Sequence, residues 1–350
     1  MKEMQFVIGL MSGTSLDGLD ICLASFDEKN GKLSGEIRKA ETIPYTEEWL
    51  KKLKRAEHCV GSELAELHDE YGKFLGECVN DFIGRNKLSQ QISLVSSHGH
   101  TIYHNPSAGY TFQLGSGISL RKTCGIPVAC DFRSGDVALG GQGAPLVPIG
   151  DRLLFGEYEY CLNLGGFANI SFEKDAKRIA YDICPANYVL NRLAERAGKK
   201  YDDGGRMSEG GVTVPFLLEK LNALPYYSKP HPKSLGREWA EQNIFPLFSN
   251  EIPTADLLRT FTEHVAIQIG KETSCPGKML VTGGGAHNGF LISRMKDLCK
   301  AEIVIPDKNI VDFKEALIFA LLGFLRMKNE VNILSSVTGA GKDSCGGELF

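Results

Sequence analysis

The sequence predicts an α/β protein built from two similar units, and three observations lead to this prediction. At 350 residues the chain is long enough for two domains that each bury a core. Apolar runs at 5–10 and 19–26 flank a turn rich in Gly, Ser and Thr, which predicts strand, turn and strand. The same pattern recurs at 161–172, and a further buried strand is predicted at 278–282, so we expect a duplicated unit.

Composition places the protein among ordinary globular chains. Hydrophobic residues make up 43% and charged residues 23%, which excludes disordered and fibrous classes. A net charge of −4 and one short basic run at 51–55 argue against nucleic acid as a partner. The ten cysteines form no CxxC pair, which indicates reduced thiols and no zinc site. Because no secretory or membrane-spanning pattern is present, we expect a soluble cytoplasmic protein with no membrane partner.

The second hairpin precedes a carboxylate at the end of a strand. Residues 161–172 alternate around Gly165 and Gly166, and the strand predicted at 179–181 puts Asp182 at its carboxyl end. Backbone N–H groups of such a turn can hold phosphate oxygens, and the acid can take a proton from a nucleophile, as phosphoryl transfer requires. A plain hairpin followed by a helix-capping Asp is the alternative.

A histidine-rich segment follows a buried strand predicted at 92–97. His98, His100 and His104 lie close in sequence, but their spacing after a strand forms no metal-binding helical face. We expect these side chains to line a substrate cleft, with structural histidines as the alternative.

The segment 131–145 joins the two hairpin-bearing halves, so we expect it to form the floor or hinge of the cleft. Arg133, Asp136 and Gln142 are available there to hydrogen-bond a hydroxylated ligand. A Gly-rich hinge with a surface ion pair is the alternative.

Two further segments of the second half are candidates for function. A Pro- and Tyr-rich stretch at 224–237 predicts a long loop, and such loops are usually functional or disordered. The strand at 278–282 ends in Gly283, Gly284 and Gly285 before a helix, and open α/β sheets bind ligands at such strand ends. The third glycine of a Rossmann fingerprint is absent.

The last predicted helix covers 313–327 and is apolar nearly all round, so we expect it between layers. An Asp-x-x-Glu capping box of Asp312 and Glu315 is expected to open it. Glu315 is then a capping residue or, alternatively, a carboxylate directed into the cleft.

Taken in order, the two hairpins, the glycine loop and the closing helix resemble the actin/hexokinase/Hsp70-type ATPase fold, in which two ribonuclease H-like α/β domains face each other across an ATP and sugar cleft. Within it, the chain resembles the anhydro-N-acetylmuramic acid kinase family over nearly its whole length. The motifs that carry this resemblance are MSGTSLDG (11–18), DFR (131–133), GGQGAPLVP (140–148), NLGGFANI (163–170), PKSLGRE (232–238) and GGGAHN (283–288).

The resemblance implies an ATP- and Mg²⁺-dependent enzyme of peptidoglycan recycling. Such an enzyme opens the 1,6-anhydro ring of anhydro-N-acetylmuramate and phosphorylates O6, giving N-acetylmuramate 6-phosphate. The resemblance also implies a homodimer of two-domain chains. We expect an N-terminal domain at 1–131, with helix 312–328 packing back on it, and a C-terminal domain at 132–350.

The resemblance also implies roles for individual residues. Asp182 matches the general base of the family. The residues expected to contact ATP are Gly13, Thr14, Ser15, Leu16, Asp17, Gly18, Leu19, Asp20, Gly165, Gly166, Gly283, Gly284 and Gly285. The residues expected to contact the sugar are His100, Arg133, Gln142 and Glu315.

The chain departs from the family beside the expected base. The family usually reads Asp-Thr-Gly-Pro-Gly-Asn where residues 182–187 read DICPAN, and Cys184 and Ala186 add Cβ atoms where backbone could approach substrate. Residues 206–209 also differ from the Trp and small residues that are more usual. Because the carboxylate is kept, kinase chemistry is expected, with another anhydro-sugar or a hexose hydroxyl as the alternative acceptor. A non-catalytic ATP-binding protein of the same fold is a further alternative.

Overall fold

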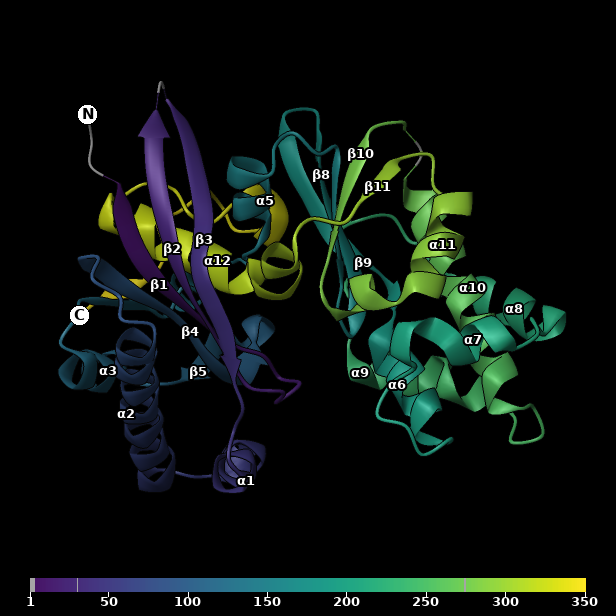
Figure 1. The fold of residues 1–350 in the computed structure, drawn as a ribbon, viewed down its shortest axis with the longest axis horizontal. Coiled ribbons are helices and arrows are strands. Elements are labelled where there is room, and N and C mark those ends of the chain that lie inside the picture. The colour runs from purple at the N-terminus through teal and green to yellow at the C-terminus, as the bar shows by residue number, and fades with distance from the viewer. Residues whose placement is uncertain (1–3, 30, 274) are drawn as a thin grey trace. The chain divides into compact units, whose positions relative to one another are not determined.

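The computed structural model describes residues 4–29, 31–273 and 275–350, and its backbone divides into two compact units (Figure 1). The first unit comprises the described residues up to Leu154 together with Phe313–Phe350, and the second comprises Phe155–Asp312. The predicted boundary at residue 131 therefore differs from the observed division. Residues 132–154 and the C-terminal segment belong to the first unit, because helices from both segments pack together within it.

The first unit contains a sheet with the strand order β12-β6-β4-β1-β2-β3, with β5 paired to β4. Strands β1, β2 and β3 form an antiparallel meander, whereas β4 runs parallel to β1 and β6 runs parallel to β4. The strands are β1 (Gln5–Ser12), β2 (Leu19–Lys29), β3 (Lys32–Ile43), β4 (Ile92–Asn105), β5 (Tyr110–Leu114), β6 (Val128–Cys130) and β12 (Glu348–Leu349).

Alternating residues of β1 direct the two faces of this sheet to different helices. Ile8 and Leu10 are fully buried in a core shared with Tyr71 and Leu75 of α2. Gly9 points to the other face, where an added Cβ would meet backbone atoms of Ala316 in α12, so this helix lies directly on the strand (Figure 1). The helices of this unit are α1 (Glu47–Arg55), α2 (Ser62–Arg85), α3 (Gly117–Cys124), α4 (Ser134–Ala138), α5 (Pro148–Leu154), α13 (Ser335–Thr338) and most of α12 (Lys308–Met327).

The second unit has the strand order β11-β10-β7-β8-β9. Strands β7, β8 and β9 form an antiparallel meander, β10 runs parallel to β7, and β11 runs parallel to β10. The strands are β7 (Tyr160–Leu164), β8 (Phe167–Lys174), β9 (Lys177–Pro185), β10 (Lys278–Thr282) and β11 (Glu302–Val304). Read from the third strand of the meander, the order β3-β2-β1-β4-β6 of the first unit matches β9-β8-β7-β10-β11 of the second, with the same strand directions, while β12 and β5 extend the first sheet. The predicted duplication of an α/β unit is confirmed.

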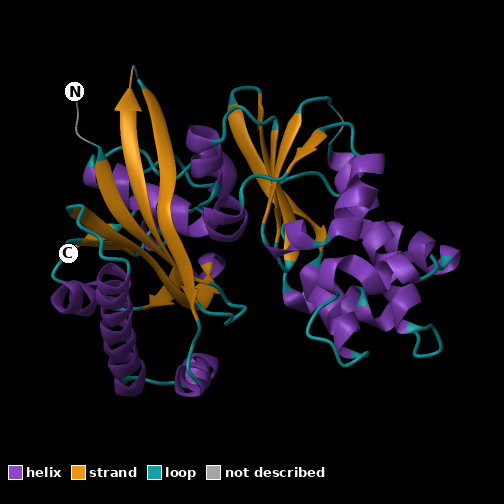
Figure 2. Cartoon of the chain, in the orientation of Figure 1, coloured by secondary structure: helices purple, strands orange, loops and turns teal. Residues whose placement is uncertain are grey.

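Helices accompany the second sheet as they do the first (Figure 2). Leu257, Phe261 and Val265 of α10 share a core with Leu162 of β7 and Val281 of β10. The helices of this unit are α6 (Asn187–Glu195), α7 (Arg206–Gly210), α8 (Pro215–Asn222), α9 (Arg237–Asn243), α10 (Thr254–Glu272) and α11 (Gly289–Leu298). Within the described part of the chain, no helix combines the length and apolar character needed to cross a membrane.

Candidate active site

The first glycine-containing turn lies between β1 and β2, as predicted. The two strands pair up to Ser12 and Leu19, and the turn is closed by a hydrogen bond from the Leu16 N–H to the Gly13 carbonyl oxygen at 3.2 Å. Thr14, Ser15 and Asp17 are exposed in the turn, where they can meet a ligand. The Leu19 side chain, by contrast, is buried in the core. Only its backbone remains available for the predicted ATP contact.

His100 supports this turn from behind. Its Nδ1 lies 2.8 Å from the Ser12 hydroxyl, which also lies 2.6 Å from the Tyr45 hydroxyl, and Tyr45 in turn lies 2.7 Å from the hydroxyl of Tyr71. Burial lowers the pKa of His100 to about 4, so the ring is neutral at pH 7. The structure places this predicted sugar contact within a buried polar chain at the end of β1.

Arg133 lies beside His98 and fixes the loop that contains Gln142. Its Nη2 lies 2.9 Å from His98 Nε2, and its Nη1 donates to the Gly143 carbonyl oxygen at 2.6 Å. The buried Asp136 carboxylate accepts from the Gly143 N–H at 2.7 Å. The Gln142 side chain is exposed on the same loop. This segment lies wholly within the first unit, so it is not the hinge between the halves, and the expectation that it forms the floor of the cleft stays a prediction.

Glu315 is electrostatically coupled to Arg133 but does not cap a helix as predicted. Burial raises the pKa of Glu315, while the positive charges of Lys314 and Arg133 oppose the rise. Helix α12 begins earlier, at Lys308, where the Asp307 side chain accepts from the Asn309 N–H at 2.9 Å. Asp307 therefore caps the start of α12. The helix is kinked at Phe313 (φ −120°, ψ 15°), next to the predicted start, and there the Asp312 carboxylate contacts His287 Nε2 at 2.7 Å.

In the second unit, the two glycine turns lie against each other. The Asn187 side chain donates to the Leu164 carbonyl oxygen at 3.0 Å, at the start of the turn that holds Gly165 and Gly166. Gly283 adopts φ +83°, and a Cβ on Gly285 would lie 2.6 Å from that of Leu164. A side chain at either position would separate the loops, which explains the glycines. The predicted helix after this loop is confirmed as α11, capped by Asn288.

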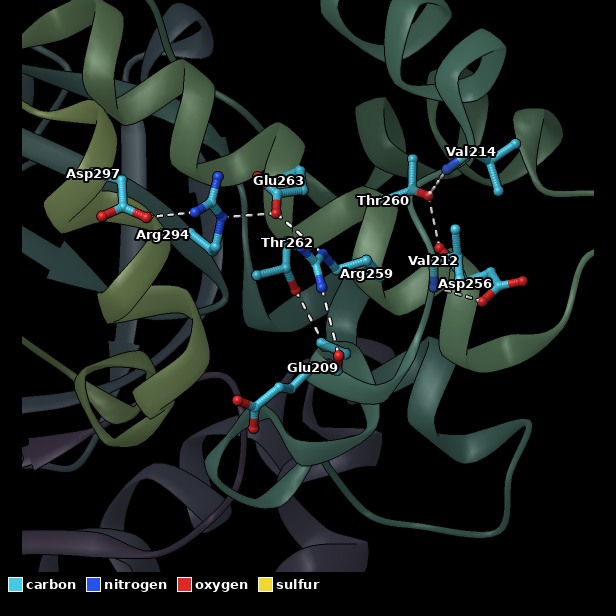
Figure 3. Close-up of polar contacts among 11 residues, drawn as sticks. Glu209, Val212, Val214, Asp256, Arg259, Thr260, Thr262, Glu263, Arg294 and Asp297 are labelled. Atoms are coloured by element: carbon cyan, nitrogen blue, oxygen red, sulfur yellow. Dashed lines mark hydrogen bonds and ion pairs between the residues drawn. The ribbon is translucent and has the colours of Figure 1, made fainter.

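A polar network links helices α7, α10 and α11, the last of which follows the glycine loop at 283–285 (Figure 3). The buried Glu263 carboxylate of α10 accepts from Arg294 Nε of α11 at 2.7 Å and from Arg259 Nε at 3.1 Å. The Thr262 hydroxyl of the same helix donates to the Ser208 hydroxyl of α7 at 3.2 Å. Residues 206–209, where the chain departs from its resemblance, are therefore tied to the helix scaffold through Ser208.

Asp182 lies on β9, which continues beyond it to Pro185, so the prediction that it ends a strand is wrong. The register with β8 shifts between Asn169–Asp182 and Ala168–Cys184, so Ile183 is an extra residue opposite no partner. Such a bulge bends a strand and redirects its side chains. The bulge directly follows Asp182, at the position where the sequence predicted the end of the strand, and it changes the direction of the Asp182 side chain.

Three hydrogen bonds connect Asp182 to the predicted loop at 224–237. The Leu235 N–H donates to its carboxylate Oδ2 at 2.9 Å, the Tyr226 hydroxyl donates to its carbonyl oxygen at 2.6 Å, and its own N–H donates to the Lys233 carbonyl oxygen at 3.3 Å. Burial raises the pKa of the Asp182 carboxyl, and the Leu235 hydrogen bond opposes this rise. The carboxyl is therefore a stronger base than an ordinary aspartate.

The residues beside Asp182 that differ from the usual family sequence are buried in the core. Ile183, Cys184 and Ala186 are 1%, 0% and 0% exposed and belong to the hydrophobic core of the second unit. Their side chains therefore fill packing space and do not add bulk at the carboxylate.

Sequence reasoning missed the residues that hold Asp182. The stretch at 224–237 stood out as a functional loop, and Lys233 lies within a quoted motif, which was the available signal. The Leu235 contact uses a backbone N–H, which carries no residue-type signature. The roles predicted for the individual site residues stay predictions.

Two α/β units of one strand order, with glycine turns and a held carboxylate in the second, define the actin/hexokinase-like class of ATPases and kinases predicted above. The chain belongs to the anhydro-N-acetylmuramic acid kinase family, whose model matches residues 5–350.

Two curated relatives agree with this assignment. The chain is 34% identical over 359 residues to the anhydro-N-acetylmuramic acid kinase of Sulfurovum sp. (strain NBC37-1), covering 98% of each chain. It is 33% identical to that of Gloeobacter violaceus (strain ATCC 29082 / PCC 7421), covering 96% of each. Among solved structures, it is similar to the activator of the 2-hydroxyisocaproyl-CoA dehydratase from Clostridium difficile with bound ADPNP, with a TM-score of 0.47, 15% identity and coverage of 93% of this chain and 96% of that one.

Proposed function

We propose that this chain is an ATP-dependent kinase that hydrolytically opens the 1,6-anhydro ring of 1,6-anhydro-N-acetylmuramic acid and phosphorylates O6. The product is N-acetylmuramic acid 6-phosphate, formed in peptidoglycan recycling. Family membership over residues 5–350 supports this choice of sugar and reaction. The proposal includes a homodimer in the cytoplasm.

The observation that carries the proposal is the state of Asp182. Its carboxylate is held by the Leu235 N–H at 2.9 Å, and burial raises the pKa of this carboxyl above the ordinary value. A general base works best when its pKa approaches the operating pH and its geometry is fixed in advance. The direction of the Asp182 pKa shift and the fixed Leu235 hydrogen bond both favour this role.

The proposed reaction couples hydrolysis of the anhydro bridge to phosphoryl transfer. Asp182 takes a proton from a water molecule whose oxygen forms a bond to the anomeric carbon, and the bond from that carbon to O6 breaks. The electron pair stays on O6, which forms a bond to the γ-phosphorus, and the bond between this phosphorus and the bridging oxygen breaks to release ADP. Backbone N–H groups of the glycine turns at 165–166 and 283–285 stabilise the charge on the phosphate oxygens.

The first turn fits the phosphate end of the nucleotide. Magnesium ions at such sites are held by substrate phosphates together with one or two protein carboxylates. No group of three or more His, Cys, Asp or Glu side chains suited to a metal ion occurs within the described ranges, whereas Asp17 and Asp20 lie in or beside the turn. The Asp20 carboxylate already accepts from the Thr42 hydroxyl at 2.6 Å. Mg²⁺ bound with the nucleotide would be held mainly by the phosphates and would neutralise charge on the transferring group. The remaining predicted contacts, ATP at 13–20 and sugar at His100, Arg133, Gln142 and Glu315, belong to the same proposal.

The test is ATP turnover with and without 1,6-anhydro-N-acetylmuramic acid in water enriched in ¹⁸O. We expect sugar-dependent ADP release and one solvent oxygen at the anomeric position, read by product mass. Sugar phosphorylation without solvent oxygen would replace the hydrolytic step with direct phosphorylation of a hydroxyl. ATP turnover that no sugar stimulates would overturn the assigned substrate.

A further inference from the structure

One face of α10 contacts two residues of the loop that holds Asp182 and the helix end that precedes this loop. His264, Gln268 and Glu272 are spaced four residues apart and therefore lie on one side of the helix. His264 Nε2 lies 2.9 Å from the Tyr227 hydroxyl near the beginning of the loop. Gln268 Nε2 donates at 2.6 Å to Oδ1 of Asn222, the last residue of α8, which precedes the loop.

Lys233 holds the other end of the loop. Its side chain is only 6% exposed, and its ammonium lies 3.3 Å from Glu272 Oε1. The same ammonium lies 5.3 Å from the ring centres of both Tyr181 and Tyr226. The second oxygen of Glu272 accepts from the Tyr181 hydroxyl at 2.6 Å.

A buried lysine of this kind is costly, because its hydration must be replaced by protein groups. The ion pair and the two aromatic faces replace that hydration at one location only. Lys233 therefore has a strongly preferred position, and the backbone on either side of it is fixed along with it. That backbone supplies the Lys233 carbonyl oxygen to the Asp182 N–H and, two residues later, the Leu235 N–H to the Asp182 carboxylate.

We propose that Lys233 is a positioning residue for Asp182: its ion pair with Glu272 fixes the loop so that the Leu235 N–H holds the catalytic carboxylate. The inference rests on the proposed role of Asp182 as the base. Neither Lys233 nor Glu272 hydrogen-bonds to the Asp182 carboxylate in the contacts described, so both act through the loop.

Release of the loop is expected to change the pKa of the Asp182 carboxyl in a definite direction. An N–H that donates to a carboxylate favours the ionised form, so releasing the loop raises the pKa of Asp182 further. The titratable or charged groups in the surroundings of Asp182 are Tyr181 and Cys184 on β9, Tyr226, His231 and Lys233 on the loop, and Glu272 on α10. Because the Lys233 charge acts in the same direction, a variant that removes only the N–H is needed.

The experiment compares the full-length protein with Lys233→Met, Lys233→Arg and the pair Leu235→Pro and Leu235→Ala. The Asp182 carboxyl is titrated by infrared difference spectroscopy, with Asp182→Asn identifying its band, and kcat and KM are measured in parallel. We expect Lys233→Met and Leu235→Pro each to raise the midpoint by about 1 pH unit and to lower kcat about tenfold. Lys233→Arg keeps the charge and the reach, and Leu235→Ala keeps the N–H, so both stay close to the parent.

Lys229→Met is the matched control, because Lys229 is exposed on the same loop. A Lys233→Met protein that loses activity with an unmoved Asp182 midpoint would overturn the positioning role. Equal midpoints in Leu235→Pro and Leu235→Ala would overturn it as well, and this pair leaves the Lys233 ion pair untouched. Failure of the proposed function has a different signature, since the parent would then lack sugar-dependent turnover while the Asp182 midpoint still responds to Lys233.

Discussion

The guanidinium of Arg133 approaches His98 Nε2 with two nitrogens, Nη2 at 2.9 Å and Nε at 3.3 Å. Because guanidinium can only donate, Nε2 must be the unprotonated nitrogen of the ring. The other ring nitrogen, Nδ1, then donates its proton to the Gly99 carbonyl oxygen at 2.8 Å. Burial, with the Arg133 charge as the second cause, lowers the pKa of His98 to about 3. Geometry and electrostatics therefore agree on a neutral histidine.

We predict that the His98 ring carries its proton on Nδ1 at pH 7. Long-range ¹H–¹⁵N correlation spectra, with His98→Asn to identify the signals, measure this directly. In Arg133→Gln the loss of the positive charge raises the His98 midpoint, although burial keeps it below the ordinary value of 6.5. A wild-type ring protonated on Nε2 would contradict the arrangement.

Replacing Asp182 by Asn removes the base but preserves the size of the side chain. We expect kcat to fall by about 10²- to 10⁴-fold, the usual contribution of general base catalysis, with little change in ATP affinity by calorimetry. Asp175→Asn, in the exposed turn between β8 and β9, is the control and keeps full activity. Near-normal turnover of Asp182→Asn would remove Asp182 from the mechanism.

Gly141 is packed against the carboxylate that holds the neighbouring loop. An added Cβ would overlap Asp136 Oδ2 and lie 2.8 Å from the Cβ of Ala340. We expect Gly141→Ala to destabilise the first unit by about 1–3 kcal/mol, measured as a lower midpoint of denaturation. Gly135→Ala has no heavy atom within 4 Å of its Cβ and lies in α4, so its stability equals or exceeds that of the parent. Equal losses in the two variants would refute this account of the loop.

His264 makes the stability of the second unit depend on pH. Burial, and secondly the charge of Lys271, lowers its pKa to about 3, whereas the unfolded chain takes up a proton near the ordinary value of 6.5. The contribution of neutral His264 to the free energy of unfolding is therefore complete above pH 6.5 and decreases as the pH falls toward 3. At pH 4 the free energy of unfolding is lower by about 3 kcal/mol than at pH 7.

Thermal melting followed by circular dichroism at pH 7 and pH 5 measures this dependence. We expect His264→Gln to melt lower at pH 7 but to show a smaller difference between the two pH values. His58→Gln, with a side chain that is 77% exposed, leaves the difference unchanged. A pH difference that is the same in His264→Gln and the parent would assign the effect to other groups.

Local patterns in the sequence were sufficient to predict both hairpins, because alternation around a Gly-rich turn is decided within a few residues. Strand β4 shows where such patterns fall short. The apolar run predicted a strand at 92–97, whereas β4 extends from Ile92 to Asn105. Its polar half is stabilised by antiparallel pairing with β5, for example His100 with Leu114, and a partner strand is not visible in the residues of one segment.

The surroundings of Asp182 could be predicted only in part, for a similar reason. Asp182 and the loop at 224–237 were both visible in the sequence. Their contact depends on the bulge at Ile183 and on residues of α10 that lie 37 and 39 positions after the loop residues they contact. In α12 the predicted start at 313 coincides with a kink at Phe313 in a helix that begins at Lys308. Asp307 caps that earlier start, and Asp312 beside the kink pairs with His287. In both places, contacts between residues far apart in the sequence determined a local structure that the sequence of one segment did not determine.

The first unit takes helix α12 and strand β12 from a part of the chain that follows the second unit. On the ribosome, every residue of the second unit is therefore made before the helix that lies on Gly9. The nascent chain can complete the core around α10 while one face of the earlier sheet still lacks its cover. During translation, synthesis of the first unit thus begins before that of the second unit and ends after it.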